Sequence, residues 1–105
     1  YSKIGIYAGT SASNNRIYTT DDGTSTGSGG FEPSWLMIKR TTGAGWYIID
    51  NKRSTVSDKK DYLRADDNGN EGTSTTGITF NSDGFTFNGA SFNLSPDTHI
   101  YMAFK

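Results

Sequence analysis

The chain has 105 residues, of which 32% are hydrophobic and 13% aromatic, and it contains no cysteine. This length suits one domain with a modest core, and the missing cysteines exclude disulfides, thiolate metal sites and cysteine nucleophiles. Ten cations and eleven anions give a net charge of −1. The chain therefore has no strong positive electrostatic field that would attract nucleic acid or an anionic membrane. We therefore expect neither of them as a partner.

Short apolar and aromatic runs, separated by turn residues, recur along the chain in place of helical periodicity. Gly, Ser, Thr and Asn interrupt every candidate helix, so the pattern predicts an all-β, antiparallel domain over residues 1–105. The close spacing of the runs is typical of a β-sandwich or a barrel. About eight strands are expected, at residues 3–7, 17–19, 35–40, 46–50, 62–65, 78–80, 85–87 and 100–104.

Two connections predict hairpins. The segment TTGAG joins residues 35–40 to residues 46–50, and NSDG joins residues 78–80 to residues 85–87. The Asp83-Gly84 pair is a strong signal for a tight hairpin turn. The polar segments DDGTSTGSGG and DDNGNEGTSTTG are expected to be loops.

The densest apolar run lies in GGFEPSWLMIKR, residues 29–40. Pro33 has no amide hydrogen and suits the start of a strand, and the consecutive apolar residues after it indicate burial on both faces. We expect a central strand that leaves the core at Lys39 and Arg40, whose long side chains reach water at the rim. The aromatic residues expected in the core are Trp35, Phe80, Phe85, Phe87 and Phe104.

One polar loop offers oxygen donors at alternating positions, which suits Ca²⁺. Its sixth position carries a glutamate where an EF-hand loop has glycine, and no glutamate stands at the twelfth. An ordinary polar turn is the favoured interpretation, so we expect no cofactor. The candidate ligands are Asp66, Asn68, Asn70 and Glu71.

Catalytic patterns are weak. His99 is the single histidine; it is expected at a sheet edge or near the end of the chain, and no nucleophile elbow accompanies it. The acid-rich loops offer carboxylate pairs, but nothing marks two of them as facing each other across a cleft. We expect no enzymatic activity.

Aromatic residues at strand ends are the best candidates for a binding site, because sugar rings stack on aromatic faces. Successive strand residues point to opposite sides, so one of Trp46 and Tyr47 is accessible, and Tyr62 follows a charged loop. Asp50 and Arg53, in that mixed-charge segment, would form a polar rim. The alternatives are core packing for the rings and a solvated loop for the charges.

Several segments, in this order, carry a resemblance: YSKIGIYAG, GFEPSWLMIKRT, GWYIIDNKR, YLRADDNGNEGT, ITFNSDGFTF and HIYMAF. Together they resemble a domain of bacteriophage virion proteins, found especially in tail fibres and appendages and similar in fold to concanavalin-like lectins. The resemblance implies a jelly-roll β-sandwich, a place on the virion surface or outside the cell, and no catalytic residues. Asn93-Leu94-Ser95 matches a glycosylation sequon, which such an origin makes incidental.

The preferred hypothesis is a non-enzymatic structural module of a phage tail fibre or decoration protein that binds host-surface glycans. The chain begins without Met, so we expect a part of, or a product processed from, a larger protein. The alternative is a self-assembling subunit of an extracellular filament, a homo-oligomer in which KIGIY or HIYMAF pairs with a neighbouring chain. A glycan hydrolase is the third hypothesis.

Overall fold

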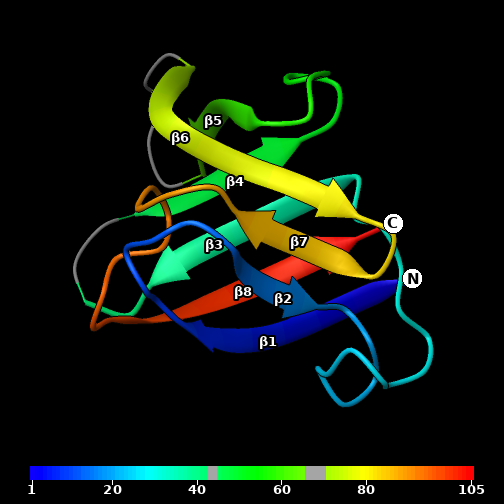
Figure 1. Cartoon of the computed structure of the whole chain (residues 1–105). Coiled ribbons are helices and arrows are strands. Elements are labelled where there is room, and N and C mark those ends of the chain that lie inside the picture. Colours follow the sequence, from blue (N-terminus) through cyan, green and yellow to red (C-terminus); the bar gives the residue numbers. More distant parts are fainter. Residues whose placement is uncertain (43–44, 66–70) are drawn as a thin grey trace.

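In the computed structural model, which describes residues 1–42, 45–65 and 71–105, every regular element is a strand (Figure 1). No helix that could cross a membrane occurs in these ranges. The all-β prediction is therefore confirmed. The strands are β1 (Ser2–Ala8), β2 (Asn15–Tyr18), β3 (Trp35–Arg40), β4 (Trp46–Asp50), β5 (Lys59–Arg64), β6 (Gly72–Asn81), β7 (Gly84–Phe87) and β8 (Thr98–Phe104).

The strands form one antiparallel sheet in the order β1-β8-β3-β4-β5-β6-β7-β2. A register shift in β5, between Lys59 and Asp61, lets that strand take part in both halves of the sheet. The half with β6, β7 and β2 curls over the half with β1, β8, β3 and β4 (Figure 1). At one end the two edge strands meet, because the Asn15 Nδ2 group donates to the Ala8 carbonyl at 3.0 Å.

Both predicted hairpins are confirmed. β3 pairs with β4, with Leu36 opposite Ile49, and β6 pairs with β7, with Asn81 opposite Gly84 across a two-residue turn. β3 is also central, as predicted, because β8 lies on its other side. β8 has neighbours on both sides, so the prediction that HIYMAF could pair with another chain is wrong. The edges are β1 and β2.

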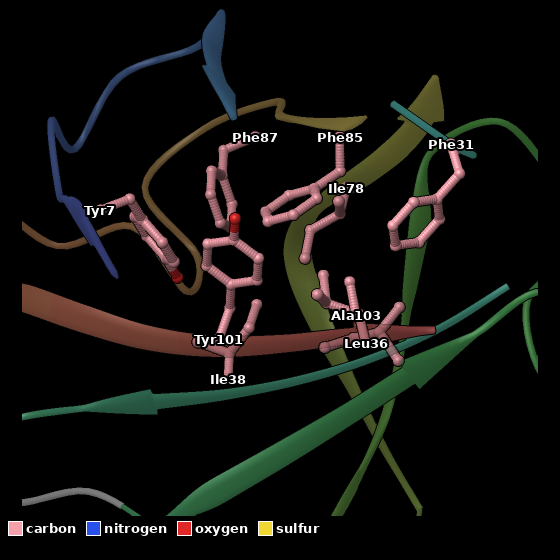
Figure 2. Close-up of a cluster of buried hydrophobic side chains, with 10 residues drawn as sticks. Tyr7, Phe31, Leu36, Ile38, Ile78, Phe85, Phe87, Tyr101 and Ala103 are labelled. Atoms are coloured by element: carbon pink, nitrogen blue, oxygen red, sulfur yellow. The ribbon is translucent and has the colours of Figure 1, made fainter. Parts of the chain in front are cut away.

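The core lies between the two halves of the sheet. Figure 2 shows Phe85 and Phe87 of β7 and Ile78 of β6, which face side chains of β3 and β8 in the other half of the sheet. The Tyr7 and Phe87 rings lie 4.8 Å apart and the Phe85 and Tyr101 rings 5.2 Å apart, distances at which aromatic pairs stabilise each other. The buried apolar residues are Tyr7, Phe31, Leu36, Ile38, Ile49, Ile78, Phe85, Phe87, Tyr101 and Ala103.

The prediction that Trp35 and Phe104 belong to this core is wrong. They stand opposite each other on β3 and β8, on the outer face of the sheet, with their rings 5.3 Å apart and Phe104 40% exposed. The reason is strand alternation. Leu36 occupies the inward position on β3 and Ala103 the inward position on β8, and both are fully buried, so their neighbours point outward.

Two strands begin well before the predicted residues. β6 begins at Gly72 and β5 at Lys59, because backbone pairing such as that of Asp61 with Thr73 does not require apolar side chains. The polar residues of β6 alternate between exposed and half-buried positions. Polarity alone therefore led to the wrong prediction of a loop there.

Candidate functional site

A cavity of about 200 Å³ opens at the inner face of the sheet, between β3, β4, β5 and the segment that joins β7 to β8. Its volume corresponds to roughly seven water molecules at about 30 Å³ each. That is smaller than a site for a drug-sized ligand, which needs about 300 Å³ or more. The lining residues are Ile38, Arg40, Tyr47, Tyr62, Ser74, Ser91, Phe92, Leu94 and His99.

Three aromatic rings form one wall of the cavity. Tyr47 and Tyr62 take inward positions on the neighbouring strands β4 and β5, and Phe92 reaches them from the loop after β7. The ring centres of Tyr47 and Tyr62 are 5.1 Å apart, those of Tyr47 and Phe92 5.3 Å, and those of Tyr62 and Phe92 5.7 Å. All three pairs meet edge to face, the arrangement that aromatic rings prefer. The three rings therefore form one contiguous wall.

Phe92 holds its place at a conformational cost. Its φ is 62°, in the left-handed region, which costs a residue with a side chain about 1–2 kcal/mol. Bulky residues with such a φ are uncommon and concentrate where function constrains the backbone. Next to it, Asn93 is fully buried and bonded to the segment around Thr10, which fixes the backbone of the loop.

Two substitutions at Phe92 test this conformation. Both Phe92→Gly and Phe92→Ala remove the ring, but only glycine adopts a positive φ without strain. We expect the free energy of unfolding of the Gly variant to be about 1 kcal/mol higher than that of the Ala variant. Urea denaturation of both variants measures this difference. Equal stabilities, or a more stable Ala variant, would contradict the left-handed backbone.

His99 is buried against the inner end of the cavity. Only 1% of it is exposed, and its ring stacks on Tyr7 with the centres 4.8 Å apart and the planes 4° apart. Nε2 lies 3.3 Å from the Leu94 carbonyl oxygen, while Nδ1 is buried without a partner among the described residues. Burial lowers the pKa of His99, which favours the neutral ring. With Nε2–H donating to Leu94, Nδ1 is left as an acceptor.

Stability should therefore depend on pH through His99. Since its pKa is lower in the folded chain than its ordinary value of about 6.5, the unfolded chain binds more protons below that pH, and acid destabilises the fold. Nearby charges on Asp97 and Arg40 act in opposite directions, and the pKa of the stacked Tyr7 is raised by burial, so Tyr7 stays neutral. We expect the free energy of unfolding to fall by up to about 1.4 kcal/mol per pH unit below about pH 6.5.

Urea denaturation between about pH 5 and about pH 8 measures this dependence, because most carboxylates stay ionised in that range. The matched variant His99→Gln cannot titrate and should show a flatter profile. A wild-type profile that rises toward acid would mean that the charged imidazolium is stabilised by folding, which the buried ring does not allow.

The polar groups of the cavity carry balanced charge. The guanidinium of Arg40 lies 3.2 Å from the Asp97 carboxylate and also donates to the Thr42 carbonyl. The remaining polar lining consists of neutral groups, among them the Ser74 and Ser91 hydroxyls. This lining suits a neutral ligand with hydroxyl groups better than an ion.

The structure separates the five residues predicted to bind glycans. Tyr47 and Tyr62 lie together in the cavity, whereas Trp46, next in the chain, points to the opposite face of the sheet because strand residues alternate. Asp50 ends β4 away from the cavity; its carboxylate accepts from the Arg53 amide at 2.6 Å. Only the two tyrosines therefore form one site.

The predicted calcium ligands are also divided. Asp66, Asn68 and Asn70 lie outside the described residues. Glu71 is described, and it accepts a hydrogen bond from Arg53 at 2.7 Å, which makes it part of an ion pair. Among the residues that the structure describes, no three acidic or histidine side chains gather in a way that could hold a metal ion.

Several lining residues were not predicted to belong to a binding site. His99 was expected at a sheet edge or near the end of the chain. It lies on the last strand, β8, which is interior to the sheet, and it points inward; its alternation with the apolar Tyr101 was the available signal. Arg40 shares an inward face with Ile38 in the same way. The positions of Phe92 and Ser91 follow from the path of a loop, for which the sequence offers no comparable signal.

The fold and the cavity define a small all-β domain with an aromatic-walled cavity on the inner face of its sheet. The model of the family described as "Domain of unknown function (DUF7483)" matches residues 1–105, so the chain belongs to that family. Searches of curated proteins and of solved structures gave no match.

Proposed function

We propose that the chain is a non-enzymatic, jelly-roll-like module of a phage virion appendage, a tail fibre or a decoration protein, and that it binds one ring of a host-surface polysaccharide. The observation that carries the binding role is the cavity walled by Tyr47, Tyr62 and Phe92. The place on a virion rests on the resemblance of the ordered segments to phage appendage domains. In this proposal the module acts at the virion surface, outside the cell.

A sugar ring suits the chemistry of this cavity. Sugars present apolar C–H faces, which pack on aromatic rings, and hydroxyl groups, which need donors and acceptors at the sides. The wall of three rings would meet the face of the sugar, and the Ser74 and Ser91 side chains would meet its hydroxyl groups. Because Arg40 is paired with Asp97, a neutral sugar would not leave a charge unbalanced.

Binding, rather than hydrolysis, is the role favoured by the surroundings of His99. A histidine that activates a nucleophile must lie within hydrogen-bond reach of it. Instead, Nε2 lies against the Leu94 carbonyl and the ring lies flat on Tyr7. A glycan hydrolase is thus the weaker hypothesis, and release of reducing sugar from a bound polysaccharide would support it.

An array of bacterial surface glycans, followed by calorimetric titration with the oligosaccharide that binds, tests the proposal. We expect Tyr62→Ala and Tyr47→Ala to weaken binding at least about tenfold, corresponding to about 1.4 kcal/mol. Trp46→Ala is the matched control, since it removes a neighbouring ring from the opposite face and should leave the affinity unchanged. Loss of binding in the Trp46 variant alone, or no binding to any glycan by the wild-type chain, would overturn the binding role.

The filament hypothesis keeps one supporting observation. β1 is an edge strand of seven residues that pairs only with β8, and a long edge can accept a strand of a neighbouring chain. Negative-stain imaging of the isolated chain tests this alternative. Filaments that disappear in an Ile6→Pro variant, which blocks the edge of β1, would support it, and particles of uniform size at high concentration would contradict it.

A further inference from the structure

The outer face of the sheet, opposite to the cavity, is apolar along its centre and carries a few polar side chains on either side. We define this face by the outward side chains of β1, β8, β3, β4 and β5. Its central row crosses all five strands, because the register places these side chains next to one another. The residues of the row are Ile4, Met102, Met37, Ile48 and Leu63.

The rows on either side continue the apolar surface. One contains Phe104 beside Trp35, and the other contains Ile6 beside Ile100. Ile4 is 66% exposed, Ile6 70% and Phe104 40%. The largest apolar patch on a soluble monomer measures about 300–600 Å² and is often a surface that binds another molecule. This face therefore needs an explanation that the cavity on the opposite side does not supply.

We propose that the outer face binds the same face of a second copy, giving a closed two-fold dimer. Sheets pack face to face through apolar side chains at about 10 Å, and a two-fold dimer uses one self-complementary patch twice. Five strands about 4.8 Å apart, each about 20 Å long, present roughly 500 Å² per copy. The pair thus approaches the roughly 1,000 Å² that a specific interface needs.

The charges on this face favour a second copy over an unrelated partner. Lys39 and Asp50 lie on adjacent strands and on opposite sides of the central row. A two-fold axis along that row brings Lys39 of each copy near Asp50 of the other. The net charge of −1 also means that two copies repel each other only weakly. An unrelated apolar partner would gain nothing from this arrangement of one cation and one anion.

Analytical ultracentrifugation of the wild-type chain, from about 1 μM to about 1 mM, is the first test. We expect the mass to rise from that of an 11.4 kDa monomer toward twice that value and to stop there. Assemblies that grow beyond the dimer would point to pairing through edge strands, and a monomer at the highest concentration would mean that something other than a second copy covers the face. Either result overturns the proposal.

Matched variants locate the interface. Ile4→Lys combined with Met102→Lys places two cations on neighbouring positions of the central row. We expect the Kd of the dimer to be at least tenfold higher in this double variant than in the wild type. Val56→Lys is the control, because Val56 is 63% exposed, close to the value for Ile4, but lies in the loop after β4. Circular dichroism confirms that each variant is folded. A dimer that survives in the folded double variant, or is lost in the Val56 variant, would contradict the assignment.

Discussion

Replacing Asn93 with alanine is expected to lower the free energy of unfolding by about 3 kcal/mol or more, because this one buried side chain joins two distant segments. Its Nδ2 lies 3.1 Å from the Thr10 hydroxyl, 3.0 Å from the Ala12 carbonyl and 3.1 Å from the Gly89 carbonyl. Its Oδ1 accepts from the Thr10 amide and from Asn15. Alanine would leave several of these groups without their partners.

The consequence extends to the candidate site. Asn93 joins the connection between β1 and β2 to the loop that carries Phe92. Without its hydrogen bonds, both the position of Phe92 in the cavity wall and the contact between the edge strands are less well fixed. A completely buried side chain also means that the sequon at Asn93 is inaccessible to glycosylation in the folded chain. Urea denaturation measures the stability. Affinity for the oligosaccharide found on the array should fall in the same variant.

Asn81→Ala is the matched control for this prediction. Asn81 is half-buried and donates a side-chain hydrogen bond to Thr86 across the β6–β7 hairpin. Loss of a bond of this kind costs about 1 kcal/mol. Equal losses of stability in the two variants would contradict the special position of Asn93, as would a stability unchanged by Asn93→Ala.

Truncating Phe87 to alanine is expected to lower the free energy of unfolding by about 3–5 kcal/mol, which is a large part of the stability of a small domain. Phe87 is completely buried and its ring contacts both Tyr7, at 4.8 Å, and Phe85, at 5.7 Å. It therefore joins β1 and β7, strands from opposite halves of the sheet (Figure 2). The cavity left by the ring could not be filled without separating the two halves.

Phe80→Ala provides the graded comparison. Phe80 points inward from β6 but is only half-buried, and the Lys59 ammonium lies 5.2 Å from its ring centre. We expect the loss of stability on truncating Phe80 to be less than half of that for Phe87, because Phe80 buries less apolar surface on folding. Thermal denaturation of both variants measures the order. A Phe80 variant as unstable as the Phe87 variant would contradict the placement of the core.

Local features of the fold could be predicted from the sequence. The bounds of β3 and β4 agree with the predicted residues 35–40 and 46–50, because alternation, a short connection and flanking turn residues act between near neighbours in the chain. The hairpin at residues 81–84 was predictable for the same reason. Strand order was not, because pairs such as β1 with β8 depend on contacts between the two ends of the chain.

The face that each strand turns inward was harder to predict. On β1 the isoleucines Ile4 and Ile6 share one side, and Tyr7 stands on the other. Hydrophobicity favours the isoleucines as the buried side, whereas the structure buries Tyr7, whose hydroxyl donates to the Phe92 carbonyl at 2.7 Å. Because Lys3 and Gly5 share the buried side with Tyr7, the binary pattern of β1 points to the wrong side.

The same ambiguity limited the prediction of the candidate site. Trp46 and Tyr47 were equivalent as exposed aromatics, and the choice between them required the sheet. The cavity itself combines residues from β3, β4, β5, β8 and a loop, which no single motif in the sequence connects. Tyr62 was correctly included as an aromatic residue near Tyr47, but the sequence did not show that their rings touch.

The central claim is that the cavity on the inner face, and no other surface, binds the sugar. Backbone amide chemical shifts of a ¹⁵N-labelled chain, titrated with the oligosaccharide identified on the array, test this most directly. The structure predicts that the largest changes fall around Tyr47, Tyr62, Ser91 and His99. Changes centred instead on Ile4 and Trp46 of the outer face, or on the loop around Val56, would contradict it.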